Sequence, residues 1–218
     1  MALTLSALNL GKVYQGQPVL NDFSYRFEAG GAYAVMGPNG SGKSTLLRIL
    51  ALLEPPDTGV VQYLAGSVIL PPGLDLRRRL ALLLPNVGVF NTTVFNNVAY
   101  GLKVRGVPWE EVEVRVRRAL EAVGLCHKER QRAVTLSSGE TKRLGLARVL
   151  VIAPEVLLLD EPTASLDPAN MELVEDIILR VKDQRKTTLI VATHDHAQVE
   201  RWAGGRRLYL DRGKLLTG

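Results

Sequence analysis

Apolar and polar residues alternate along much of the first thirty positions of the chain. The alternation runs through residues 3–10 and returns at residues 23–27, with glycines at positions 11, 16, 30 and 31 as punctuation. A period of two places every second side chain on the same face of a strand, and glycine favours the turns between strands. We therefore expect short antiparallel strands at the amino terminus.

Further along the chain, the apolar residues form continuous short runs instead. Residues 32–36, 156–159 and 188–191 are almost wholly apolar, as strands buried on both faces are. Helical patterns at residues 45–53 and 171–182 follow the first two runs. This order of strand and helix predicts an α/β fold with a mostly parallel sheet.

The middle of the chain, from about residue 75 to 151, reads as mostly helical. Its clearest helix is predicted at residues 108–123, which begin with proline and acidic residues, contain arginines later and are followed by Gly124. We expect this region to be a subdomain inserted into the sheet. Residues 1–218 then form one domain, with a core of residues 1–84 and 152–218 and a helical subdomain of residues 85–151.

The composition is close to that of an average globular protein. The 218 residues are 46% hydrophobic and 22% charged, which fits one domain or a core with a subdomain. The longest apolar runs are far shorter than the roughly 18 residues of a membrane span, and the first residues do not look like a secretion signal. The single cysteine, Cys126, allows no internal disulfide and fits a reducing cytoplasm.

The net charge of +5 permits an anionic partner but does not require one. The densest basic run, residues 77–79, has no aromatic residues between its arginines on which bases could stack. We interpret this run as a solvated face or a patch near lipid headgroups, and we expect no nucleic acid as a partner.

A glycine-rich stretch after the first buried strand has the spacing G-x-x-x-x-G-K-[ST] of a phosphate-binding loop. Its glycines let the backbone curl so that N–H groups converge on phosphate oxygens, and the following helix directs its positive end at the same anion. We expect Lys43 to reach the β- and γ-phosphates and the Ser44 hydroxyl to bind Mg²⁺. The loop comprises Gly37, Pro38, Asn39, Gly40, Ser41, Gly42, Lys43, Ser44 and Thr45.

Two adjacent carboxylates, Asp160 and Glu161, end the second apolar run. A buried parallel strand has little reason to end in two acids unless they face a site at its carboxyl end. Because neighbouring side chains on a strand diverge, the two acids have different roles. We expect Asp160 to hold Mg²⁺, directly or through water, and Glu161 to polarise the attacking water.

Several further motifs occur in the order of one known family. Residues 136–140, LSSGE, are similar to its signature LSGGQ or LSGGE, with Ser138 in place of the first glycine. Residues 164–167 resemble its D-loop, residues 193–195 its switch-histidine region, and Tyr14 lies where it places an aromatic that stacks on adenine. The chain thus resembles, over nearly its whole length, the nucleotide-binding subunits of ATP-binding cassette (ABC) transporters.

This resemblance implies a P-loop NTPase core with a mostly parallel sheet, an amino-terminal antiparallel β subdomain and an inserted α-helical subdomain. It implies an ATPase that uses ATP and Mg²⁺, with Glu161 and His194 as catalytic residues. The signature of one subunit caps the ATP of another in this family, with Ser137 and the Gly139 N–H on its γ-phosphate. Glu140 and Asp167 are further expected nucleotide-binding residues. Because the chain has one phosphate loop and one signature, a complete pair of sites needs a partner cassette, most simply a second copy.

One family residue is missing from the loop after residues 80–84. The family places a glutamine there, five residues before the aromatic of an F-x-x-T-V segment, and this chain has Pro85. Proline has no polar side-chain atom with which to bind Mg²⁺ or water. Either Asn86 partly substitutes or the contact is lost. We expect ATPase activity to persist in both cases, with weakened Mg²⁺ binding or altered coupling to the membrane subunit.

The resemblance also bears on the type of transporter. A single compact cassette is similar to prokaryotic importers, whose membrane subunits are separate chains. Residues 90–107 and 167–178 look most like cassettes for oxyanion uptake, of the tungstate, molybdate and phosphate type. The resemblance then implies permease subunits, an extracytoplasmic solute-binding protein and a cytoplasmic position on the inner face of the membrane. The alternatives are an exporter cassette and a soluble ABC ATPase, although the latter typically carries tandem cassettes or a long coiled-coil insertion.

Overall fold

The computed structural model describes residues 3–185, 187–204 and 206–216. The chain divides into two compact units. The first contains the chain up to Leu82, residues 155–161 and the chain from Lys182 onward, and the second contains residues 83–154 and 162–181. Among the described residues, no helix is long and apolar enough to cross a lipid bilayer.

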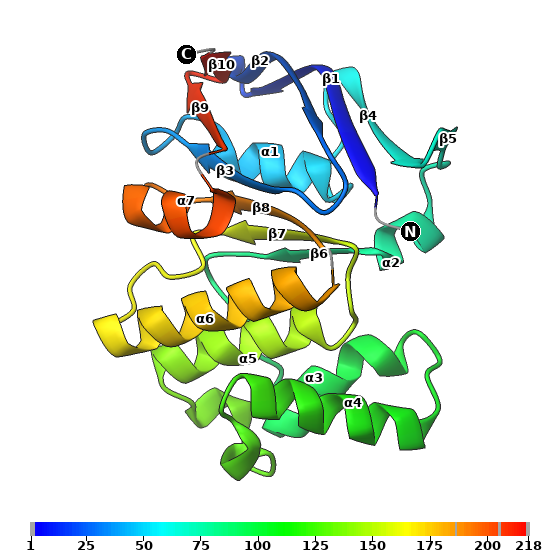
Figure 1. Cartoon of the computed structure of the whole chain (residues 1–218), viewed down its shortest axis with the longest axis vertical. Helices are drawn as coiled ribbons and strands as arrows, with labels where there is room; N and C mark the ends of the chain where they lie inside the picture. Colours follow the sequence, from blue (N-terminus) through cyan, green and yellow to red (C-terminus); the bar gives the residue numbers. More distant parts are fainter. Residues whose placement is uncertain (1–2, 186, 205, 217–218) are drawn as a thin grey trace. The chain divides into compact units, whose positions relative to one another are not determined.

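An antiparallel sheet occupies one side of the first unit (Figure 1). Its strands lie in the order β2-β1-β4-β5, and irregularities in the register interrupt the pairing of β1 with β2 and with β4. This agrees with the antiparallel strands expected at the amino terminus, although β1 and β2 are each eleven residues long. The strands are β1 (Thr4–Tyr14), β2 (Gln17–Phe27), β4 (Thr58–Ala65) and β5 (Val68–Ile69).

The second sheet of this unit is mostly parallel and has the order β10-β9-β3-β8-β7-β6. Strand β3 pairs in parallel with β8 and β9, and β7 pairs in parallel with β8. Only the β9–β10 hairpin is antiparallel among the pairings described. The strands are β3 (Ala32–Met36), β6 (Leu80–Leu83), β7 (Val156–Asp160), β8 (Thr188–Ala192), β9 (Arg207–Asp211) and β10 (Lys214–Leu216).

Helix α1 (Lys43–Leu50) contacts strands of both sheets, as Figure 1 shows. Leu46, Leu47 and Ile49 are completely buried on it and belong to one core cluster with residues of β1, β2, β3 and β7. Burying three such side chains contributes about 1.5–3 kcal/mol each. The core therefore holds the start of α1 at the carboxyl end of β3. Helices α2 (Leu74–Arg78) and α7 (His196–Ala203) complete the unit.

The second unit is helical. Helix α3 packs against α4 and α5, and α4 packs against α5. Its helices are α3 (Val94–Lys103), α4 (Trp109–Ala122), α5 (Ser138–Leu150) and most of α6 (Pro168–Arg185), with short 3₁₀ turns at Cys126–Lys128 and Ala133–Thr135. We expected residues 162–181 in the core, but the structure groups them with this unit. Gly139 of α5 and Asn170 of α6 approach so closely that a Cβ at Gly139 would lie 2.8 Å from the Asn170 Cγ.

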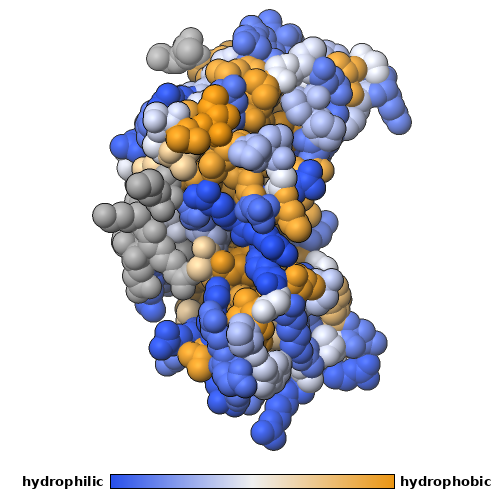
Figure 2. Space-filling view, turned by 90° about the vertical axis from the view of Figure 1, so that its right-hand side faces the viewer, coloured by the Kyte–Doolittle hydropathy of each residue, from blue (hydrophilic) through white to orange (hydrophobic). Residues whose placement is uncertain are grey.

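Large apolar side chains also reach the surface. Figure 2 shows orange apolar residues between blue hydrophilic ones on one face of the molecule. In the second unit, Phe90, Tyr100 and Trp109 are about half exposed. Exposed aromatic residues of this kind are common where proteins contact a partner.

Candidate functional site

The predicted phosphate-binding loop connects β3 to α1. Gly37, Gly40 and Gly42 have φ angles of 144°, 80° and 104°, which residues other than glycine rarely adopt. A Cβ at Gly42 would also lie 2.5 Å from the Val19 carbonyl oxygen. The glycines are therefore required for the path of this loop, and they leave its backbone open to an anion at the start of α1.

Lys43, the first residue of α1, bends back over this loop. Its side chain is buried, and its Nζ donates hydrogen bonds to the carbonyl oxygens of Gly37 at 2.7 Å and Pro38 at 3.0 Å. The ammonium group thus lies among the loop backbone, where a bound phosphate group would meet it. Ser41, in the same loop, has a buried hydroxyl oxygen with no hydrogen-bond partner among the described residues.

Asp160 lies at the carboxyl end of β7 and is only 1% exposed. Neither carboxylate oxygen has a hydrogen-bond partner within the part of the chain that the structure describes. Burial raises the pKa of Asp160, with a smaller contribution from the charge of Glu161, while the nearby Ser44 hydroxyl and Lys43 oppose this shift. A buried carboxylate without a partner is costly, and a hard cation such as Mg²⁺ would satisfy both oxygens. The donor set of Asp160 and Ser44 therefore fits such a cation.

This burial gives a prediction for stability. When folding raises the pKa of a carboxyl, the folded state becomes less stable as the pH rises from the unfolded pKa through the folded one. Ionised Asp160 therefore destabilises the fold at neutral pH. Asp160→Asn removes the charge and should raise the Tm without nucleotide or Mg²⁺, by about 2–4 °C for each kcal/mol recovered. Thermal unfolding at pH 7 tests this, with the exposed Asp75→Asn as the control. A lower Tm for Asp160→Asn would contradict the account of this carboxylate.

The Glu161 side chain follows that of Asp160 in the chain but points in a different direction, because the backbone conformation of Glu161 is unusual. Its φ angle of 47° lies in the left-handed region, which costs about 1–3 kcal/mol for a residue other than glycine. The His194 Nδ1 lies 3.1 Å from both carboxylate oxygens of Glu161. Because His194 follows β8, the strand next to β7, the sheet brings these residues together. The structure thus places both predicted catalytic side chains in contact.

Tyr14, the last residue of β1, is held by a polar network that the sequence did not reveal. Its hydroxyl donates to Glu54, which also accepts from Arg48 Nε at 3.1 Å. Arg48 in turn donates to the Thr45 hydroxyl at 3.2 Å, and Lys12 lies 5.6 Å from the centre of the Tyr14 ring. The network connects the predicted adenine-stacking residue with the phosphate loop.

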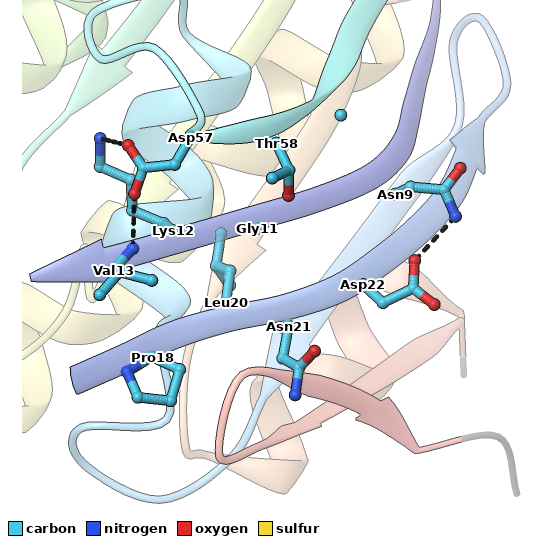
Figure 3. Close-up of a pocket in the computed structure, with 11 residues that line it drawn as sticks. Asn9, Gly11, Lys12, Val13, Pro18, Leu20, Asn21, Asp22, Asp57 and Thr58 are labelled. Atoms are coloured by element: carbon cyan, nitrogen blue, oxygen red, sulfur yellow. Dashed lines mark hydrogen bonds and ion pairs between the residues drawn. The ribbon is translucent and has the colours of Figure 1, made fainter. Parts of the chain in front are cut away.

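A separate pocket of about 460 Å³ opens beside this network, between β1, β2 and β4. Figure 3 shows that Asp57 at its rim binds both the Lys12 ammonium, at 2.9 Å, and the Val13 N–H, at 2.7 Å. Asn9 and Asp22 lie elsewhere in it and are hydrogen-bonded to each other. None of the predicted nucleotide-binding residues lines this pocket, so we do not include it in the site.

The signature residues lie in the second unit, at the start of α5. Ser137 is the N-cap of α5: its hydroxyl accepts from the Glu140 N–H, and the Glu140 carboxylate accepts from the Ser137 N–H. A hydroxyl that accepts one hydrogen bond can still donate its own proton. Asp167 accepts hydrogen bonds from the N–H and the side-chain amide of Asn170, the residue that faces Gly139. Ser137, Gly139, Glu140 and Asp167 thus lie at the starts of α5 and α6.

Glu140 yields a prediction for pH dependence. Hydrogen bonds from Lys128, at 2.5 Å, and from the Ser137 N–H lower the pKa of Glu140 to about 2. A lowered pKa stabilises the fold above the unfolded value of 4.5, and this stability is lost as the pH falls toward 2. Glu140→Gln keeps the cap but loses the ion pair, so its Tm should be below that of the wild type at pH 7 by up to a few degrees. The difference should shrink at pH 3, and a constant difference would contradict the assignment.

Comparison with known proteins gives consistent matches. A family model described as ABC transporter matches residues 20–164. A tungstate uptake system ATP-binding protein, TupC of Peptoclostridium acidaminophilum, is 37% identical over 99% of this chain and 97% of its own length. A probable anion import ATP-binding protein of Haloferax volcanii is 40% identical over 90% of this chain and 74% of its own length.

Solved structures agree with the fold. The cassette MJ0796, in a dimeric post-hydrolysis state bound to ADP and Pi, has a TM-score of 0.86 over 98% of this chain and 97% of its own, at 24% identity. The protein cbiO1 of Clostridium perfringens, described as part of the ABC transporter complex cbiONQ, has a TM-score of 0.85 at 28% identity, over 100% of this chain and 88% of its own. These likenesses confirm the predicted P-loop NTPase fold.

Proposed function

The chain belongs to the ABC transporter family as an ATP-binding subunit with ATPase activity, and from this premise we propose that it powers import through separate membrane subunits. The observation that carries the proposed site is the grouping at the ends of β7 and β8. There, the buried Asp160 carboxylate has no hydrogen-bond partner by geometry within the described residues and is influenced by Ser44 and Lys43 of the phosphate loop, and the Glu161–His194 pair follows the same two strands.

In the proposed reaction, water attacks the γ-phosphorus of ATP and the bond to the β–γ bridging oxygen breaks. Glu161 accepts the proton of the attacking water, while His194 holds the carboxylate in place through its Nδ1. The Lys43 ammonium and the N–H groups at the start of α1 neutralise the charge that develops on the phosphates. Ser44 and Asp160 would hold Mg²⁺, which would supply further neutralisation of the phosphate charge.

The second unit supplies the other half of each site. We propose that Ser137, Gly139, Glu140 and Asp167 of one copy close over the ATP that the phosphate loop of a second copy binds. The Ser137 hydroxyl keeps a proton to donate, and the N-terminus of α5 favours an anion. ATP then joins two copies, and loss of the γ-phosphate after hydrolysis separates them.

The transported solute is proposed from the relatives. Two proteins that this chain resembles are named for tungstate uptake and anion import, and a third, of Natronomonas pharaonis, is a phosphate import ATP-binding protein with 36% identity. We propose an oxyanion importer, with permease subunits, an extracytoplasmic solute-binding protein and a position at the inner face of the membrane. An exporter cassette remains the second candidate, because the chemistry of the ATP site is the same.

Purification of the tagged chain from solubilised membranes of its own cells tests this proposal. Mass spectrometry should identify a permease and a solute-binding protein, and tungstate, molybdate or phosphate added with the latter should stimulate ATP turnover. The control is the same turnover assay in chloride buffer that contains neither sulfate nor any of these oxyanions. A partner permease without any solute-binding protein would favour export, and the absence of a membrane partner would contradict both candidates.

A further inference from the structure

The loop that lacks the family's glutamine is bound to the signature helix by a lysine. The Lys142 side chain of α5 is buried, and its Nζ donates a hydrogen bond of 2.7 Å to the carbonyl oxygen of Pro85. Both residues belong to the second unit. A charged donor makes a stronger hydrogen bond than a neutral one, and a buried ammonium group is costly without its acceptor. The contact therefore holds Pro85 firmly against α5.

Two other residues of α5 contact the same loop. Arg148 donates to the Gly88 carbonyl oxygen at 2.6 Å and lies 4.9 Å from the centre of the Phe90 ring. Gly145, which lies between Lys142 and Arg148 in the helix, has no side chain, and a Cβ there would lie 2.8 Å from the Val87 Cγ2. Positions 142, 145 and 148 are three residues apart and so share one face of a helix. This face of α5 is shaped to receive residues 85–90.

The polar contacts of this face go to backbone atoms of the loop. A carbonyl oxygen is present whatever the side chain, so proline serves as an acceptor as well as glutamine would. Proline also fixes its own φ angle near −65°, which reduces the freedom of the loop. Asn86, the other candidate for the role of the missing glutamine, is exposed. The hydrogen bonds from α5 to the loop thus go to its backbone, while Phe90 at the far end is also held by Asn97 of α3, which bonds both its N–H and its carbonyl oxygen.

We propose that Lys142 is the positioning residue of the loop 85–90, which it holds through the Pro85 carbonyl at the residue where this chain lacks the family's glutamine. Arg148 and Gly145 support the same placement. The direct consequence is local: α5, which carries the signature at its start, and the loop move as one piece. The consequence for coupling to a membrane subunit rests on the proposed function.

Backbone amide relaxation of the isotope-labelled full chain tests the local claim. Amides of residues 86–89 should have order parameters near 0.85 in the wild type, and Lys142→Met should lower them below about 0.6. The Phe90 amide should change less, because its N–H donates to the Asn97 side chain of α3. Lys142→Arg keeps a charged donor and should restore most of the order. The matched control is Arg143→Met, because Arg143 donates from the same helix to a different carbonyl, that of Val123.

Unchanged order parameters in Lys142→Met would overturn the proposal, as would an equal loss in Arg143→Met. Gly145→Ala gives an independent check, because its new methyl group must displace Val87 and shift the Val87 methyl resonances. With a co-purified permease, Lys142→Met should lower partner-stimulated turnover several-fold while basal turnover persists. A loosened loop with normal stimulation would leave the positioning role intact and contradict the coupling role alone.

Discussion

Glu161→Gln is expected to lower ATP turnover at least about a hundredfold, because general-base groups typically contribute factors of 10² to 10⁴. Glutamine has nearly the same shape but cannot accept the proton of the attacking water. ATP binding should persist, since the phosphate loop and Lys43 are unaffected. Phosphate release under steady-state conditions measures the first effect, and titration with a fluorescent ATP analogue measures the second.

The matched control for this variant is Glu200→Gln, which changes a surface glutamate of the same unit that pairs only with Arg207 at 3.6 Å among the contacts described. Its turnover should equal that of the wild type. Normal turnover in Glu161→Gln would show that another group activates the water, and the assignment of the Glu161–His194 pair would then be wrong.

Lys43→Ala is expected to weaken ATP binding by about 10- to 100-fold, since a hydrogen bond to a charged group contributes about 1.5–3 kcal/mol. The Lys43 Nζ already lies among the loop carbonyls, so little reorganisation is needed before it meets a phosphate group. Equilibrium titration with ATP measures the dissociation constant. Lys214→Ala, which removes an exposed lysine of β10, should leave this constant unchanged. An unaltered constant for Lys43→Ala would exclude residues 37–45 as the phosphate site.

Several elements could be predicted because their signals are local. The apolar run at residues 32–36 coincides with β3, and the helix expected at residues 108–123 is Trp109–Ala122, with Pro108 at its N-cap. The helix expected at residues 171–182 starts earlier, at Pro168. Proline is favoured in the first turn of a helix, so Pro168 marks this start in the sequence.

The arrangement of the site could be predicted only in part. Glycine spacing predicts the phosphate loop, and the acids after an apolar strand make Asp160 and Glu161 candidates for the site. The contact of Glu161 with His194 depends on the order of β7 and β8 in the sheet, and no local pattern encodes the positive φ angle of Glu161. Likewise, Tyr14 and Glu54 are forty residues apart in the chain, so their hydrogen bond follows from the fold alone.

The most direct test of the central claim, that ATP joins two copies of this chain, is the solution mass of Glu161→Gln measured by light scattering with and without ATP and Mg²⁺. This variant should bind ATP without consuming it, so the mass should rise from 23.9 kDa to twice that value only when both are added. Ser137→Ala in the same background should weaken the association. A mass that stays at 23.9 kDa while ATP is demonstrably bound would contradict the account.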